Sequence, residues 1–337
     1  MNVQVDGKTL IPAVDFMVDP SSGSSTKIWK QRPITAAEIF NAYENQKLYS
    51  SLKSNKEFNS VVIDVQNYKN DSLKKANALA YSLVELCDVM VITNEKFTFS
   101  VGREQYPNAL LFVQGKAIDN MRQIETQIES VFKARHTARN VIAMLPAKKK
   151  TKETIVFSAH YDHLGGMGQN VYFPGGNDNA SGTSMLLHLA DYFKENPVPY
   201  NIVFMAFAGE EAGLVGSKYY TENPLFKLSD IKFLLNLDIM GSGEDGITVV
   251  NATLFPKQYE ALVAINEQEK LLKQIKKRGP AANSDHYFFT EKGVPAFFIY
   301  TMGDNKHYHD VEDTYEALTF NEYLDITRLI AAFVKGL

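Results

Sequence analysis

The chain has 337 residues, of which 45% are hydrophobic and 22% are charged, and its formal net charge is −4. This is the composition of an ordinary globular protein, and the length allows two domains. The weakly acidic balance and the absence of a long basic run exclude a dedicated nucleic-acid-binding protein. The sequence contains no apolar stretch of 18 residues that could form a transmembrane helix.

Residues 1–133 are predicted to form a β-rich accessory domain. No cluster of His, Asp and Glu at catalytic spacing occurs here, so we expect a packing or substrate-restricting role. Apolar runs and turn residues predict a hairpin within 3–18, a helix over 73–86, and strands over 61–65, 89–92, 97–101, 109–113 and 124–132. The single cysteine, Cys87, excludes an intrachain disulfide, and its apolar neighbours predict a buried structural thiol.

Residues 134–337 show a different pattern, which predicts an α/β domain. Near-continuous apolar runs alternate with amphipathic helical segments, and the runs occur at 140–145, 155–159, 202–207, 233–237 and 296–300. Such runs are typical of strands that are covered on both faces. The sequence therefore predicts a mostly parallel, mixed central sheet between helix layers, with a helix over 183–193.

Metal-ligand residue types come directly after these apolar runs. They are His160, Asp178, Glu210, Glu211, Asp238 and the segment from His307 to His309. Side chains just past the carboxyl ends of parallel strands face the crevice in which α/β proteins bind ligands. We therefore expect these residues to form one site.

A mixed set of imidazoles and carboxylates is the donor set that a pair of zinc ions requires. Two zinc ions share a bridging carboxylate and lower the pKa of bound water. A further carboxylate that binds no metal must take the proton of that water. The adjacent Glu210 and Glu211 could divide these two roles.

The segments AHYDHLG, GGNDNASG, AFAGEEAGLVGS, LNLDIMG, SDHYFF and YHDVEDT occur in this order within residues 136–337. Together they resemble the co-catalytic dizinc aminopeptidases. That family includes the bacterial leucine aminopeptidases and aminopeptidase Y, and its relatives include glutamate carboxypeptidase II, glutaminyl cyclase and the transferrin receptor. The resemblance implies a zinc-exopeptidase fold with two zinc ions per chain.

The resemblance also implies a role for each matching residue. One zinc would be held by His160, Asp178 and Asp238, and the other by Asp178, Glu211 and His309. Glu210 would be the general base, Asp162 would orient the His160 ring, and Tyr308 would bind the substrate carbonyl. The peptide bond between Asp178 and Asn179 is expected to be cis.

Several neighbouring residues receive weaker expectations. Ile239 and Met240 would line the pocket for the first side chain of the substrate, and Asp285 and His286 would lie close to the substrate. His163 and His307 are interpreted as rim residues. Asp313 is expected to cap a C-terminal helix over 316–334, or to brace the loop of His309.

The leading hypothesis is a metal-dependent exopeptidase that removes an apolar N-terminal residue from peptides. A carboxypeptidase or dipeptidase remains an alternative, because Lys276, Lys277 and Arg278 could hold a substrate carboxylate. A glutaminyl cyclase is disfavoured, since the ligands that those enzymes lack are present. A non-catalytic binding protein is a third possibility, although it need not retain all these residues. The chain begins without a signal peptide, and the family resemblance favours a periplasmic or secreted location.

Overall fold

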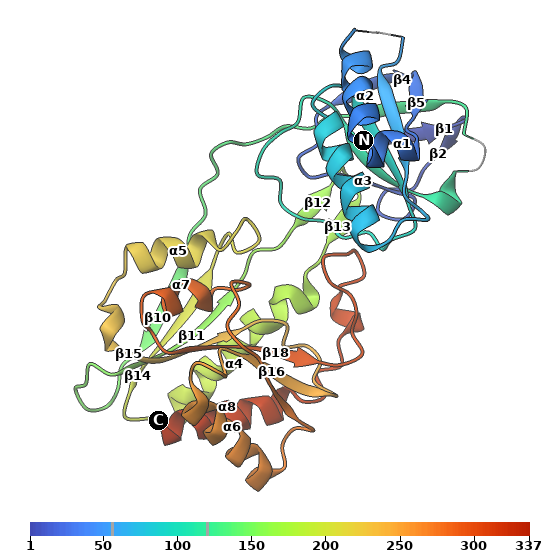
Figure 1. Cartoon of the computed structure of the whole chain (residues 1–337). Coiled ribbons are helices and arrows are strands. Elements are labelled where there is room, and N and C mark those ends of the chain that lie inside the picture. The colour runs from blue at the N-terminus through green and yellow to red at the C-terminus, as the bar shows by residue number, and fades with distance from the viewer. Residues whose placement is uncertain (55–56, 119–120) are drawn as a thin grey trace. The chain divides into compact units, whose positions relative to one another are not determined.

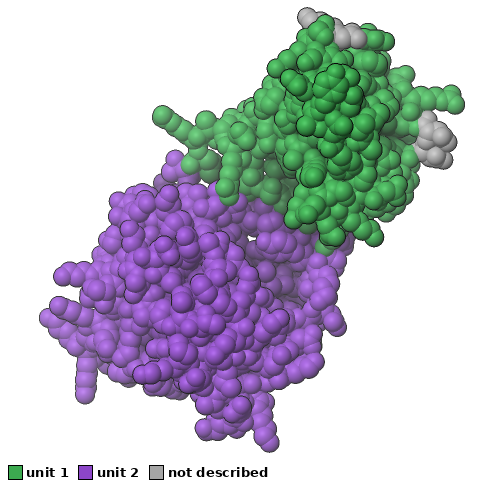
Figure 2. Space-filling model, in the orientation of Figure 1, with its two compact units in different colours: residues 1–136, 165–172 green, residues 137–164, 173–337 purple. Residues whose placement is uncertain are grey.

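The computed structural model describes residues 1–54, 57–118 and 121–337. It divides into two compact units, which Figure 2 shows in different colours. The first unit comprises Met1–His136 and Gly165–Tyr172, and the second comprises Thr137–Leu164 and Phe173–Leu337. The main division lies close to the one expected after residue 133, but the sequence pattern does not predict the return of 165–172 to the first unit.

The first unit contains two sheets. A five-stranded sheet has the order β3-β8-β7-β6-β5, with β5 to β8 parallel and β3 antiparallel to β8. A four-stranded antiparallel sheet has the order β2-β1-β9-β4. The strands are β1 (Asn2–Val5), β2 (Lys8–Thr9), β3 (Phe16–Val18), β4 (Ser25–Trp29), β5 (Gln31–Pro33), β6 (Ser60–Asp64), β7 (Asp88–Thr93), β8 (Leu110–Gln114) and β9 (Ile124–Ile128).

Helices pack on the parallel part of this unit. The sequence pattern predicts only one of these helices, α3 (Asn70–Leu83). Helix α1 (Ala36–Phe40) begins at a capping box, in which Thr35 Oγ1 accepts the N–H of Glu38 and the Glu38 carboxylate accepts that of Thr35. Helix α2 (Ala42–Ser54) follows directly. These helices have weak apolar faces, which explains why hydrophobic periodicity missed them.

Two further expectations for this unit concern residues 97–101 and Cys87. Residues 97–101 do not form a strand, because they pair with no neighbouring strand, although their burial alternates as the sequence pattern predicts. Cys87 is confirmed as a buried thiol that is 7% exposed. Burial, together with the charge of Asp88, raises its pKa to about 12.

The second unit is built on a seven-stranded mixed sheet, which confirms the predicted α/β fold. Its order is β10-β14-β11-β15-β18-β16-β17, and β14, β11, β15 and β18 are parallel neighbours. Strand β10 pairs antiparallel with β14, and β16 with β18. The strands are β10 (Val141–Leu145), β11 (Thr154–His160), β14 (Asn201–Phe207), β15 (Ile231–Leu237), β16 (Gly246–Val250), β17 (Ile275–Lys277) and β18 (Ala296–Met302). A separate two-stranded sheet joins β12 (Gly165–Met167) and β13 (Val171–Phe173).

Helices cover both faces of the seven-stranded sheet (Figure 1). One face packs on α4 (Gly182–Glu195), α6 (Pro256–Glu269) and α8 (Tyr323–Gly336). The other face packs on α5 (Val215–Glu222) and α7 (His286–Glu291). Among the described residues, no helix combines the length and the hydropathy needed to cross a bilayer.

Candidate metal centre

The predicted ligand residues come together at one edge of the seven-stranded sheet. His160 is the last residue of β11, Glu210 and Glu211 follow β14, and Asp238 follows β15. His309 lies on the loop after β18. Because β14, β11, β15 and β18 are parallel, their carboxyl ends open onto the same crevice.

Asp178, on the loop before α4, lies between two imidazoles. Its Oδ1 is 3.2 Å from Nε2 of His160, and its Oδ2 is 3.2 Å from Nε2 of His309. A carboxylate that presents its two oxygens to two separate imidazoles could bridge two metal ions. The peptide bond from Asp178 to Asn179 is cis, so this expectation is confirmed.

Two groups of candidate ligands therefore share Asp178. In the first, Nε2 of His160 is also 3.5 Å from Oδ1 of Asp238, and the ligand atoms of these three buried residues lie within 4.8 Å of one another. In the second, Nε2 of His309 is 3.2 Å from Oε2 of Glu211. Each group combines imidazole and carboxylate donors at a spacing that one zinc ion could bridge.

His163 takes part in the second group, whereas the sequence analysis interpreted it as a rim residue. Its Nδ1 is 2.8 Å from Oε1 of Glu211, and its side chain is only 11% exposed. A close approach of Gly175 makes room for it, since a Cβ at that position would lie 2.5 Å from the His163 ring. No periodic pattern marks this position, and its spacing from His160 was the only available signal.

The carboxylates of the cluster favour the binding of cations. Burial lowers the pKa of His160, but Asp238 and Asp178 outweigh it and hold that pKa well above its usual range. Asp178 and Glu211 likewise raise the pKa of His309 to about 10 against the effect of burial. Oδ1 of Asp238 is buried without a hydrogen-bond partner, and Oε1 of Glu211 has no well-directed one. Metal cations would satisfy these oxygens, so the residues present fit a pair of zinc ions.

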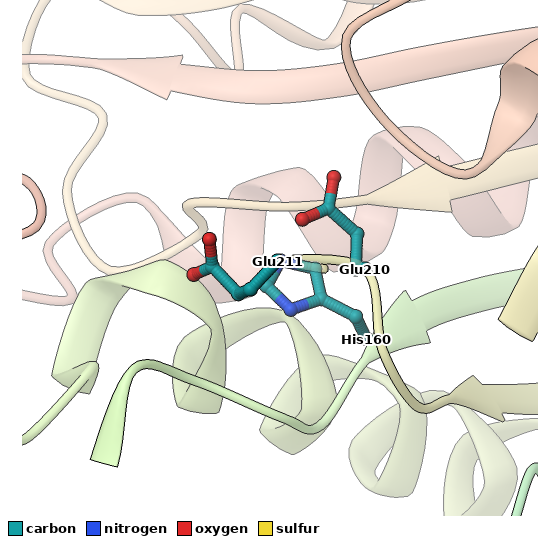
Figure 3. A group of neighbouring side chains, drawn as sticks. All are labelled: His160, Glu210 and Glu211. Carbon is teal, nitrogen blue, oxygen red and sulfur yellow. The ribbon is translucent and has the colours of Figure 1, made fainter. Parts of the chain in front are cut away.

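Glu210 is a partly buried carboxyl that belongs to neither of these two groups. Burial raises its pKa to about 9, with His160 opposing this rise and Asp285 and Asp238 adding to it. Figure 3 shows Glu210 and Glu211 side by side on the loop after β14, with His160 beneath them. Distance alone would also allow Glu210 as a ligand, because these three residues offer atoms within 4.8 Å of one another.

The Asp162 carboxylate does not make the expected contact with the His160 ring. Nδ1 of His160 is 3.0 Å from the backbone oxygen of Asp162, whereas the nearer carboxylate oxygen is 3.8 Å away. The Asp162 carboxylate instead accepts the backbone N–H groups of Glu210 and Glu211, at 3.1 and 3.3 Å. It therefore fixes the loop that carries both glutamates, and the carbonyl orients the imidazole.

Tyr308 and Asp285 lie close to this cluster. The half-exposed Tyr308 ring stacks on His309, with centroids 3.9 Å apart, and burial and Asp178 raise the pKa of its hydroxyl. Asp285 is fully buried, and burial raises its pKa to about 7. His286 is 1% exposed and lines a different cavity, on the side of α7.

The two residues after Asp238, Ile239 and Met240, lie in different surroundings. Ile239 has a positive φ of 60° and lines a cavity beside the cluster. Met240 is fully buried in the core of the second unit, and its N–H donates to Ser181 Oγ at 2.7 Å. Ile239 therefore lines one of the described cavities, whereas Met240 packs in the core.

Buried polar residues hold the ligands in place through contacts that the sequence analysis did not predict. Asp313 accepts the N–H groups of Asn177 and Asp178, at 2.9 and 3.1 Å, so it braces the bridging carboxylate. It caps no helix, since α8 begins only at Tyr323. Ser284 donates to Oδ2 of Asp238 at 2.9 Å. These contacts join loops that are far apart in the chain, so no local sequence pattern predicts them.

Comparisons with known proteins agree with this arrangement. The model of peptidase family M28 matches residues 140–334. Aminopeptidase YwaD of Bacillus subtilis (strain 168) is 28% identical over 231 residues, which cover 65% of this chain and 49% of that protein. A probable leucine aminopeptidase of Arthroderma otae is 28% identical over 212 residues, covering 59% of this chain and 57% of that protein. The chain thus matches about half the length of these relatives.

Solved structures show the same fold. The zinc aminopeptidase BSAP from Bacillus subtilis matches with a TM-score of 0.69 at 20% identity, covering 100% of this chain and 81% of that one. An aminopeptidase from Aneurinibacillus sp. strain AM-1 matches with a TM-score of 0.62 at 17% identity, covering 99% and 79%. The family match spans more than half of the chain and contains every candidate ligand. The chain belongs to peptidase family M28.

Proposed function

We propose that the protein is a dizinc aminopeptidase that removes the N-terminal residue from peptides. The observation that carries this proposal is the position of Asp178, whose two oxygens lie 3.2 Å from imidazoles of two separate ligand groups. His160 and Asp238 would complete one zinc site, and Glu211 and His309 the other. Bound zinc supplies a Lewis acid and a water of lowered pKa.

The residues around this centre can perform the remaining steps. Glu210 is a partly buried carboxyl beside His160. The charge of bound zinc would lower its raised pKa, so the ionised carboxylate could take a proton from water and pass it to the leaving amine. The Asp162 carboxylate holds the loop of Glu210 and Glu211 in place by accepting the backbone N–H groups of both residues. The Tyr308 hydroxyl is available to donate a hydrogen bond to the substrate carbonyl oxygen.

The charges favour an aminopeptidase over a carboxypeptidase. The ion pairs that the structure describes in the cluster join the carboxylates of Asp178, Glu211 and Asp238 to histidines. A surplus of carboxylates suits the ammonium group of a free N-terminus, whereas a substrate carboxylate needs Arg or Lys. Arg278, the expected alternative, donates to the Tyr300 hydroxyl at 3.1 Å on strand β18.

The test combines metal content with substrate choice. Elemental analysis should give about two zinc ions per chain, and aminoacyl-anilides should be hydrolysed until a chelator removes the zinc. N-acetylated anilides serve as the matched control and should remain intact. Cleavage of N-blocked peptides from their C-terminus would shift the function to a carboxypeptidase. A chain that fails to bind zinc would contradict the catalytic proposal and favour a binding protein.

A further inference from the structure

A pocket of about 360 Å³ lies in the first unit, at the carboxyl ends of two parallel strands. Asp64, the last residue of β6, and Ile92, near the end of β7, both line it. Sheets built from parallel strands bind their ligands outside these ends, where the loops leave a crevice. The volume is large enough for a side chain of a bound peptide.

Apolar side chains form one part of the lining. Val62 of β6 is 6% exposed and Ile34, just after β5, is 9% exposed, and Ile92 and Pro33 lie beside them at the pocket. An aliphatic chain placed on these side chains would lose contact with water, and each buried methylene group would strengthen its binding. This part of the pocket therefore favours an apolar stem.

Asp64 gives the other part of the lining a negative charge. It is exposed, and it is the charged residue among the described residues that line the pocket. None of the ion pairs described in the first unit includes its carboxylate. A cation that enters the pocket therefore meets a carboxylate that has no counter-ion of its own.

Gln66 holds this carboxylate in place. Its backbone N–H donates to Oδ1 of Asp64 at 3.0 Å, and its Nε2 lies 3.2 and 3.3 Å from Oδ1 and Oδ2. Gly115 leaves room for the arrangement, because a Cβ at that position would overlap Oε1 of Gln66. These donors are neutral, so they orient the carboxylate without cancelling its charge, and a cation can still bond to it.

We propose that this pocket binds a lysine side chain of a peptide, with the aliphatic stem on Val62 and Ile92 and the ammonium group at Asp64. A lysine combines an apolar stem with a charged end, and the lining offers a surface for each. A glutamate would meet a like charge there, and an apolar side chain would gain nothing from the carboxylate. The inference takes from the proposed function only that the ligand is a peptide, and it gives the first unit a binding role of its own.

The test measures the binding of blocked peptides to the zinc-loaded full chain by isothermal titration calorimetry. The probes are acetyl-Gly-Lys-Gly-amide and its counterparts with norleucine, which lacks the ammonium group, and with glutamate. Their blocked ends deny the metal centre the free N-terminus that an aminopeptidase requires. We expect the lysine peptide to bind about two- to fivefold more tightly than the norleucine peptide, as one exposed ion pair allows, and this difference to shrink at high salt.

Two variants separate the charge from the apolar lining, and a third is the matched control. Asp64→Asn should make the lysine and norleucine peptides bind equally. Asp71→Asn removes a carboxylate that is 90% exposed in the first turn of α3, and it should leave the preference unchanged. Ile92→Thr should weaken the binding of both peptides by about twofold and keep their ratio.

Equal affinities of the lysine and norleucine peptides for the unmodified chain would overturn the inference, as would a lysine preference that survives in Asp64→Asn. A preference that Asp71→Asn reduces just as much would overturn it too, because the general acidity of the protein would then be the cause. If n-butylamine binds as tightly as the lysine peptide, the occupant is a free amine and the assignment to a peptide is wrong.

This outcome is independent of the aminopeptidase activity, because no hydrolysis is measured. A chain that selects the lysine peptide through Asp64 but hydrolyses no aminoacyl-anilide would support this site and contradict the proposed function. A chain that hydrolyses anilides but does not select the lysine peptide would do the reverse.

Discussion

At the level of single residues, Asp178 has the largest effect because both ligand groups depend on it. We predict that Asp178→Ala binds less than one zinc ion per chain and loses hydrolytic activity, since both groups lose the carboxylate that they share. Elemental analysis after dialysis measures the loss. Asp191→Ala, at an exposed position of α4, is the control and should retain full zinc content.

Glu210 should behave in the opposite way. Glu210→Gln keeps the shape of the side chain but cannot accept a proton, so we expect normal zinc content with kcat lower by about 10²- to 10⁴-fold. Zinc analysis and steady-state kinetics on one preparation separate the two effects. If this variant loses zinc in parallel with activity, Glu210 is a ligand, as the distances also permit.

At the level of elements, the capping box of α1 makes a pH-dependent contribution to stability. Burial raises the pKa of Glu38, but hydrogen bonds from Thr35 and Arg32 outweigh it, and the net pKa lies below the ordinary value. The ionised carboxylate therefore stabilises the first unit above about pH 4.5, and this contribution is lost as the pH falls through the lowered pKa.

Glu38→Gln should accordingly reduce the free energy of unfolding of the first unit by about 1 kcal/mol at pH 7, with the difference shrinking toward zero as the pH falls through the lowered pKa. Trp29, the single tryptophan, is 3% exposed in β4, so its fluorescence during urea unfolding reports on this unit. Glu44→Gln on α2 is an exposed control and should change stability by less than about 0.5 kcal/mol at either pH. A difference that persists unchanged at low pH would contradict the ionic role.

At the level of the whole molecule, zinc should stabilise the fold because its ligands come from loops after several strands. Ligand binding to the native state adds about 2.7 kcal/mol when free zinc exceeds its Kd a hundredfold. We therefore predict that chelation lowers Tm by several degrees and that added zinc restores it, as followed by circular dichroism. Glu210→Gln should keep this response and Asp178→Ala should lose most of it, which separates specific binding from a general effect of zinc.

The sequence could predict much of the centre because its residues follow recognisable strands. Apolar runs such as 155–159 and 233–237 identify buried strands, and a buried parallel strand ends at the ligand edge of its sheet. His160 and Asp238 could thus be assigned to one site before any contact was known, and family resemblance then implied their partners. Apolar runs do not show which strands pair or in which direction. The antiparallel pairing of β10 and β16, and the lack of a pairing strand for residues 97–101, therefore could not be predicted from the sequence.

The sequence by itself determined the α/β class, the succession of strands and ligands, and the M28 motifs, because these depend on residue type and local spacing. Only the tertiary structure decided that a carbonyl rather than the Asp162 side chain orients His160, that His163 meets Glu211, and that Met240 packs in the core. Those features arise where loops distant in the chain meet, and the direction of a side chain there is set by packing and hydrogen bonds that no local pattern encodes.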